Sequence, residues 1–284
     1  MRALKERFIS HINYFFSVPA LLWQVLFLWL PLLFVVIASM MTRNSGLTFS
    51  FYTTLLTGAH ARVIFRSLTL ALFNACLCLL VAYPVAYFIS FRTERWKNIF
   101  VFLLTLPFWV NFLVHVYAWF FILERDGLLN RFLLSLRIIS EPLHVVNSVF
   151  AVSLVMFQVY LPFMILPLYV IFEKFDLRLI EASLDLGADR RQTFRKITFP
   201  LTLSGAKLGF FLVLGMSFGE FIIPQLLNGS KSLFVGTLIS DYFVVSREFS
   251  VGSAFTCLSA LVLGALMIVC LFIFKALERS AREW

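Results

Sequence analysis

One acidic side chain inside an apolar stretch stands out as a residue that could do chemistry. Glu220 lies in the run SFGEFIIPQLLNG and is, of 15 acidic residues, the only one well inside a stretch long enough to span a membrane. A carboxylate at that depth costs several kcal/mol unless it faces water, a cation or a partner. We therefore expect Glu220 to be a functional residue. A carboxylate that pairs with a neighbouring helix, or reaches the outer boundary of the membrane, is the structural alternative.

Aromatic and amide groups form a second candidate site in the run LPFWVNFLVHVYAW. There Trp109, Asn111 and Tyr117 place two aromatic faces and one amide among aliphatic side chains. The faces of Trp and Tyr attract cations, so these three residues are candidates for contact with a cation. An aromatic belt at the membrane–water interface is the alternative interpretation.

The most polar stretch of the chain, residues 176–200 (DLRLIEASLDLGADRRQTFRKITFP), separates two apolar runs. Its pattern predicts two short helices. Asp176 is a suitable N-cap for the first, and Gly187 supplies the left-handed residue that ends it. Asp189 with Gln192 three residues on fits a capping box for the second helix, and Pro200 marks the return to apolar sequence.

The first of these helices has two faces. Leu179, Ala182 and Leu186 share an apolar face, whereas Glu181 and Asp185 share a charged one. We expect one face to lie on protein and the other to face a partner.

Composition places these residues in a membrane. The 284 residues are 61% hydrophobic and only 14% charged, which excludes an ordinary soluble domain. Apolar windows of about 20 residues, the length that crosses a bilayer, predict an all-α integral membrane protein with six transmembrane helices in one domain, residues 1–284. The expected spans are 20–41, 68–89, 100–122, 146–171, 201–226 and 254–274. The net charge of +9 is scattered in short clusters, so we expect no nucleic acid partner.

The basic residues predict an orientation. The side that holds both termini and the 176–200 loop carries 15 Lys and Arg residues, including Arg2, Lys5 and Arg7. The opposite side carries 8, including Arg43 and Lys231. Because loops with excess positive charge stay in the cytoplasm, both termini and the 176–200 loop are expected to be cytoplasmic.

Two further patterns concern packing. Residues 126–137 (DGLLNRFLLSLR) are too short to span and have one apolar face, so they predict an amphipathic helix on the outer surface. Gly205, Gly209, Gly215 and Gly219 form two pairs four residues apart in the fifth span, which lets another helix approach closely. That helix is expected either in this chain or in a partner chain.

The 176–200 stretch also resembles a known motif. It is similar to the E-A-A-x3-G-x9-I-x-L-P loop of ABC importer permeases, with two departures, Ser183 for the second Ala and Phe199 for the Leu. In that family the loop is the coupling helix that docks onto a cytoplasmic ATPase. The resemblance assigns ATPase coupling to Glu181, Ala182, Ser183, Gly187, Ile197 and Pro200.

The resemblance implies a type I ABC importer permease fold in a bacterial inner membrane. It also implies a complex with a second permease subunit, a cytoplasmic ATPase dimer and an extracytoplasmic substrate-binding protein. The sequence has no G-x-x-x-x-G-K-[ST] run. We therefore expect ATP and Mg on the ATPase, no cofactor or metal on this chain, and no enzymatic activity of its own.

Three stretches of sequence resemble one branch of this family. LPFWVNFLVHVYAW, VYLPFMILPLYVIFEKFDLRLIEAS and GEFIIPQLLNGSKSLFVGTLI resemble segments of spermidine/putrescine permeases, of the type that is the first of two permeases. Because a polyamine is a multiply charged cation, this resemblance implies that Trp109, Asn111, Tyr117 and Glu220 line the substrate pathway. Importers of iron, sulfate or molybdate share the coupling loop and are the alternative. A secondary transporter driven by an ion gradient would need more charged relay residues within its spans, and a membrane scaffold would have no pathway. Co-purification with a soluble ATPase would separate both of these from the permease interpretation.

Overall fold

The computed structural model describes residues 18–41, 46, 48–56, 58–92, 95–228 and 232–282. Within these ranges the chain is helical and contains no β-strand, which confirms the expected all-α class. Of the basic residues named for the orientation, Arg2, Lys5, Arg7, Arg43 and Lys231 lie outside the described residues. The chain forms two compact units, so its assignment as one transmembrane domain stays a prediction.

The first unit contains residues 1–58 and 241–260. Its elements are the π-helical turn η1 (Val25–Trp29), α2 (Leu30–Ala38), α3 (Ser50–Leu55), the π-helical turn η4 (Asp241–Val245) and the start of α14 (Phe249–Arg282). The first predicted span is the helix Val18–Ala38, and no side chain of its apolar window is buried in the described structure. A hydrogen bond of 2.7 Å between the hydroxyls of Ser39 and Tyr52 joins the end of α2 to α3.

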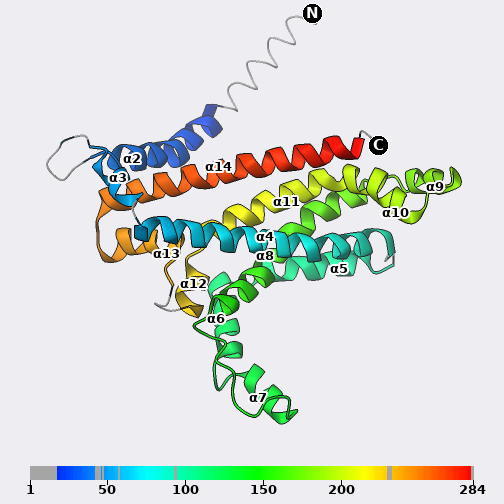
Figure 1. Cartoon of the computed structure of the whole chain (residues 1–284), viewed down its shortest axis with the longest axis horizontal. Coiled ribbons are helices and arrows are strands. Elements are labelled where there is room, and N and C mark those ends of the chain that lie inside the picture. The colour runs from blue at the N-terminus through cyan, green and yellow to red at the C-terminus, as the bar shows by residue number, and fades with distance from the viewer. Residues whose placement is uncertain are drawn as a thin grey trace, which may run out of the picture. The chain divides into compact units, whose positions relative to one another are not determined.

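The second unit contains residues 59–240 and 261–284 and carries every candidate site residue. Apart from the rest of α14, its elements are α4 (Gly58–Arg92), α5 (Lys97–Thr105), η2 (Leu106–Trp109), α6 (Phe112–Leu123), α7 (Leu128–Ser135), α8 (Val149–Glu173), α9 (Arg178–Asp185), α10 (Arg190–Thr193), η3 (Phe194–Thr198), α11 (Phe199–Gly219), α12 (Ile222–Leu227) and α13 (Val235–Ser240) (Figure 1). The short helix α7 confirms the helix predicted over residues 126–137.

Helices α8 and α11 form the centre of this unit and lie side by side (Figure 1). Their close approach depends on glycine. A Cβ atom at Gly205 would lie 2.9 Å from the carbonyl oxygen of Pro167, and one at Gly209 would lie 2.8 Å from Sδ of Met164. The first glycine pair of the fifth span therefore packs within the chain, and it is not available to a second permease. At Gly219, by contrast, no described atom lies within 4 Å of the Cβ position.

We expect Gly209→Leu to prevent stable folding. The added side chain would meet Met164, including its carbonyl oxygen at 3.1 Å from the Cβ position, and backbone atoms cannot move aside locally. Overpacking of this kind costs about 1 to 3 kcal/mol, and more when backbone is involved. The measurement is the yield of monodisperse protein extracted from membranes. The control is Gly219→Ala, which should match the wild type; equal yields for both variants would contradict the packing role of Gly209.

Buried and half-buried polar pairs join the helices around this centre. The Asn74 amide on α4 donates to the hydroxyl of Ser217 on α11 at 2.8 Å, and both side chains are buried. Lys207 on α11 forms an ion pair of 3.0 Å with Glu278 on α14. Lys207 falls inside the fifth predicted span, so this pair gives its charge a partner at that depth.

The expected third span, 100–122, is not one helix. Within the described residues, five helices are long and apolar enough to cross a membrane, and a sixth crossing exists only as a bent pair, Lys97–Trp109 and Phe112–Ser135, at 94°. The chain breaks at Val110, whose ψ of 139° is extended. The carboxamide oxygen of Asn111 then accepts hydrogen bonds from the backbone N–H groups of Leu113 at 2.9 Å and Val114 at 3.4 Å. Asn111 therefore starts a new helix where hydropathy predicts a continuous one.

Candidate functional site

The polar loop between α8 and α11 folds as its cap residues predict. Oδ1 of Asp176 accepts from the N–H of Arg178 at 3.0 Å, although the helix itself begins one residue later than expected. Gly187 has a φ of +85°, the left-handed conformation that ends α9. Asp189 and Gln192 form the expected reciprocal capping box at the start of α10. The left-handed turn at Gly187 and the capping box are confirmed, whereas the N-cap of α9 is Leu177 and not Asp176.

A buried hydroxyl pair holds α9 against α10. The Oγ atoms of Ser183 and Thr193 are 2.6 Å apart, and both side chains are buried. Since Thr193 donates its own proton to the carbonyl oxygen of Asp189 at 3.0 Å, the Ser183 hydroxyl is the donor within the pair. An alanine at position 183 could not make this contact. The departure from the family motif at Ser183 thus has a structural role.

The outer surface of α9 is apolar and exposed. Leu186 is 88% exposed, and Leu179 and Ala182 on the same face are exposed as well. Glu181 and Asp185 are also exposed. The face that lies on protein is a third one, which contains Ser183 and the half-buried Ile180 and which the sequence pattern did not indicate. Three aliphatic side chains exposed on a short helix outside the predicted spans form a surface suited to a protein partner.

The second helix of the loop was predicted to be short, but it continues into the membrane span. Helical structure runs without interruption from Arg190 to Gly219. The π-helical turn η3, which contains the half-buried Ile197, comes directly before Pro200. A proline removes one helix hydrogen bond and its ring needs space in the preceding turn. The wider π-helical turn accommodates both effects. The loop is therefore joined to the fifth span by a continuous helix.

Glu220 lies at a break in the fifth span. The predicted span 201–226 ends as a helix at Gly219, and Glu220 has extended backbone with ψ of 130°. Its Oε1 accepts hydrogen bonds from the N–H groups of Ile222 at 2.8 Å and Ile223 at 3.2 Å, so it caps the short helix α12. Its Oε2 accepts a hydrogen bond from the hydroxyl of Tyr160 on α8. The structural alternative stated for Glu220, pairing with a neighbouring helix, thus describes its contacts.

Two residues that the sequence did not single out shape this break. Tyr160 is buried in α8 and lies 60 positions from Glu220, and no local pattern links the two. Gly236 at the start of α13 lies against the break, since a Cβ there would be 2.5 Å from the carbonyl oxygen of Glu220. Gly236 ends the run SKSLFVG that follows QLLNG, and a glycine there is a signal of close backbone approach that sequence reasoning could have used.

The aromatic candidates of the third predicted span have exposed rings. Trp109 is 74% exposed and Tyr117 is 46% exposed, whereas the oxygen of Asn111 is already used to cap α6. Helix α12, which Glu220 caps, packs against α6, which carries Tyr117 (Figure 1). Trp109, Asn111 and Glu220 thus lie at two helix breaks, whereas Tyr117 lies within α6. A pathway role for these four residues stays a prediction.

The described part of the chain thus combines long apolar helices, two helix breaks and a capped polar loop joined to a continuous helix. Residues 79–283 match the family described as "Binding-protein-dependent transport system inner membrane component". The chain belongs to this family, and it is a permease of the ABC importer class.

Three relatives show which kinds of permease the chain resembles. The chain is 37% identical to the "Spermidine/putrescine transport system permease protein PotB" of Haemophilus influenzae, over 87% of this chain and 88% of that protein. It is 36% identical to PotB of Escherichia coli, over 87% of this chain and 92% of that protein. It is 30% identical to the "Inner membrane ABC transporter permease protein YdcU" of Escherichia coli, over 86% of this chain and 80% of that protein.

Solved structures confirm the expected type I ABC permease fold. A chain from a bacterial ABC transporter involved in the import of the acidic polysaccharide alginate matches with a TM-score of 0.77 at 17% identity, over 97% of this chain and 99% of that one. A chain of the alginate transporter in complex with an alginate-bound periplasmic protein matches with a TM-score of 0.74 at 15% identity, over 95% of this chain and 96% of that one.

Proposed function

We propose that this chain is a permease subunit of an ATP-driven importer that carries spermidine or putrescine across a bacterial inner membrane into the cytoplasm. The observation that carries the proposal is the exposed apolar face of α9, formed by Leu179, Ala182 and Leu186, on a loop whose motif matches a coupling helix. The names of the PotB relatives support the polyamine as substrate. Both termini and the α9–α10 loop lie in the cytoplasm in this proposal.

The proposal includes three kinds of partner. A cytoplasmic ATPase dimer binds α9 and supplies ATP and Mg, a second permease completes the pathway, and an extracytoplasmic binding protein delivers the solute. The family description and the periplasmic protein in the alginate complex support the last of these. A match over 24% of this chain to the permease PotC of Escherichia coli supports a related second permease.

The continuous helix explains how movement at the loop would reach the membrane. The helix from Arg190 to Gly219 has 30 residues, which at about 1.5 Å per residue is roughly 45 Å. The Ser183–Thr193 hydroxyl pair fixes α9 to its first turn. Closure of the ATPase dimer would displace α9 and move this helix as one body. The movement would arrive at the break at Glu220, where Tyr160 and α12 hold the chain.

The solute pathway belongs to the same proposal. The exposed rings of Trp109 and Tyr117 offer open aromatic faces to a cation. Asn111 and Glu220 shape the wall, because their oxygens hold the first turns of α6 and α12. Residual negative charge at Glu220 would favour a polyamine over an anion at this position.

We expect Leu186→Asp to remove ATPase binding while leaving the permease folded, because a charge replaces an apolar contact on an 88% exposed side chain. Retention of the ATPase during purification should fall at least tenfold, and uptake of labelled spermidine should fall with it. Leu186→Met is the matched control and should retain both activities. ATPase binding unchanged in Leu186→Asp would contradict the coupling surface. If the wild type takes up sulfate and no polyamine, the proposed substrate is wrong.

A further inference from the structure

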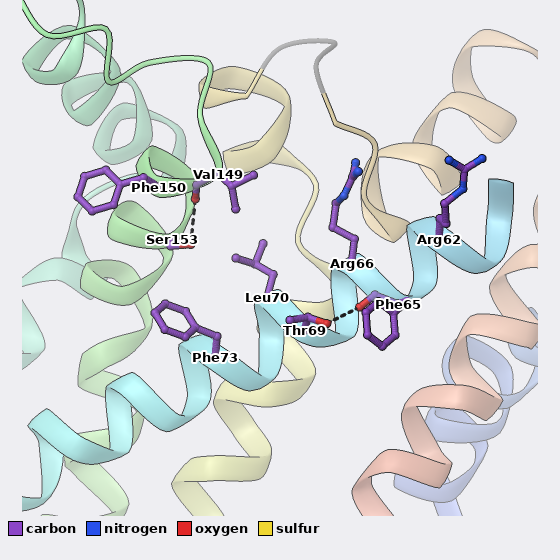
Figure 2. Close-up of a pocket in the computed structure, with 9 residues that line it drawn as sticks. All are labelled: Arg62, Phe65, Arg66, Thr69, Leu70, Phe73, Val149, Phe150 and Ser153. Atoms are coloured by element: carbon purple, nitrogen blue, oxygen red, sulfur yellow. Dashed lines mark hydrogen bonds between the residues drawn. The ribbon is translucent and has the colours of Figure 1, made fainter. Parts of the chain in front are cut away.

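A cavity of about 610 Å³ lies between α4 and the beginning of α8, away from the break at Glu220. Figure 2 shows Arg62 and Arg66 projecting from the same side of α4, with Leu70 and Phe73 further along the helix. Val149, Phe150 and Ser153 at the start of α8 complete the lining, and the Phe150 ring points away from the two arginines in this view (Figure 2). The volume is in the range that holds a small ligand, and apart from Thr69 and Ser153 the lining is either cationic or apolar.

The lining changes from charged to apolar along one direction. Arg62 and Arg66 are one helical turn apart, and Phe73 lies about 10 Å further along the axis of α4. The helix Gly58–Phe91 has 34 residues, so it is roughly 50 Å long and extends beyond a hydrocarbon layer of about 30 Å. The arginines at its first turns are therefore placed at the level of lipid headgroups, and the phenylalanine at the level of acyl chains.

The far end of α4 identifies which side of the membrane this is. Tyr87 lines a small cavity with Ile180 and Thr193 of the α9–α10 loop. Arg66 precedes Tyr87 by 21 positions, or about 30 Å of helix, which is close to the thickness of the hydrocarbon layer. The cavity therefore opens in the leaflet opposite the loop.

We propose that this cavity binds an anionic phospholipid of that leaflet. The phosphate pairs with Arg62 and Arg66, and an acyl chain lies against Leu70, Phe73 and Phe150. The N-terminal end of α8, beginning at Val149, adds a partial positive charge beside the headgroup. The site offers opposite charge at one end and apolar contact at the other. An amphiphilic lipid matches both ends. It does not depend on which solute the protein carries.

Other occupants fit less well. A polyamine would be repelled by two guanidinium groups and would find no opposing carboxylate among the residues that line the cavity. An acidic segment of a partner protein would match the arginines. It would not match the apolar part of the lining, Leu70, Phe73 and Phe150, in which the two phenylalanines are exposed.

Lipid retention measures the proposal directly. The protein is extracted with its native partners, placed in nanodiscs of phosphatidylethanolamine and phosphatidylglycerol, and released for native mass spectrometry, which counts each retained lipid. Each arginine near an anionic lipid is worth roughly a fivefold preference. The double variant Arg62→Gln/Arg66→Gln should therefore lose the preference for phosphatidylglycerol by about thirtyfold. Arg131→Gln, an exposed arginine on α7 outside the cavity, should retain it.

A second variant keeps both charges and fills the groove. Thr69→Trp places an indole in the cavity and should also reduce retained phosphatidylglycerol, even with both arginines present. An equal lipid ratio in the wild type and the double variant would overturn the proposal. So would a wild type without lipid preference whose double variant loses a partner subunit, since that result would assign the cavity to a protein.

Discussion

Replacing Glu220 with alanine is expected to destabilise the permease so strongly that little folded protein reaches the membrane. Its carboxylate accepts hydrogen bonds from Ile222, Ile223 and Tyr160, and the alanine would leave all three donors without their acceptor. Hydrogen bonds to charged groups are worth about 1.5 to 3 kcal/mol each, so the loss is about 3 kcal/mol or more. That is a large share of the stability of an ordinary domain. Thermal aggregation of the extracted protein measures the effect.

Two milder variants separate the structural role of Glu220 from a charge in the pathway. Glu220→Gln keeps an oxygen for α12 and removes the charge, whereas Tyr160→Phe keeps the charge and removes one donor. If the charge serves the pathway, Glu220→Gln lowers spermidine uptake at normal protein levels and Tyr160→Phe does not. Trp109→Leu tests the exposed ring in the same assay. Glu220→Ala with unchanged thermal stability would show that the carboxylate does not hold the break.

Gly187→Val is expected to abolish transport by changing the direction of the chain between α9 and α10. Gly187 has a φ of +85°, and a β-branched residue is strained there whatever space is available. The left-handed conformation costs an ordinary residue about 1 to 2 kcal/mol. That strain is relieved if the turn opens, which would separate Ser183 from Thr193 and misplace the apolar face of α9. ATP hydrolysis by the assembled complex, compared with spermidine uptake, measures the coupling.

The control for this prediction is Gly187→Asn. Asparagine tolerates the left-handed conformation better than other side chains, and no described atom lies within 4 Å of the Cβ position. It should therefore restore most of the uptake. If Gly187→Val transports as well as Gly187→Asn, the turn at Gly187 is not needed for coupling.

The sequence was most informative where local chemistry decides structure. Gly187, Asp189 and Gln192 adopt the predicted left-handed turn and capping box, because caps and turns depend on residues within a few positions of one another. The five long apolar helices likewise follow from hydropathy, since a bilayer requires about 20 apolar residues for a crossing.

The features that the sequence did not predict depend on contacts between distant positions. The Glu220–Tyr160 hydrogen bond joins two helices, and nothing near either residue signals the other. The glycine pair at Gly205 and Gly209 allowed two partners, and only the observed packing on Pro167 and Met164 chooses between them. Hydropathy did not predict the helix break before Asn111, because it averages apolar character over a window and does not detect one capping side chain.

The bent pair Lys97–Trp109 and Phe112–Ser135, at 94°, decides whether the chain crosses the membrane an even or an odd number of times. If the bent pair crosses once, the total is six, and an even number of crossings returns the C-terminus to the side on which the N-terminus lies; five crossings would separate the two ends. The segments Arg2 to Arg7 and Lys275 to Arg282 are both basic, which favours a common side. The prediction that both termini are cytoplasmic therefore requires the bent pair to cross once. A reporter fused to either end would then sample the same compartment.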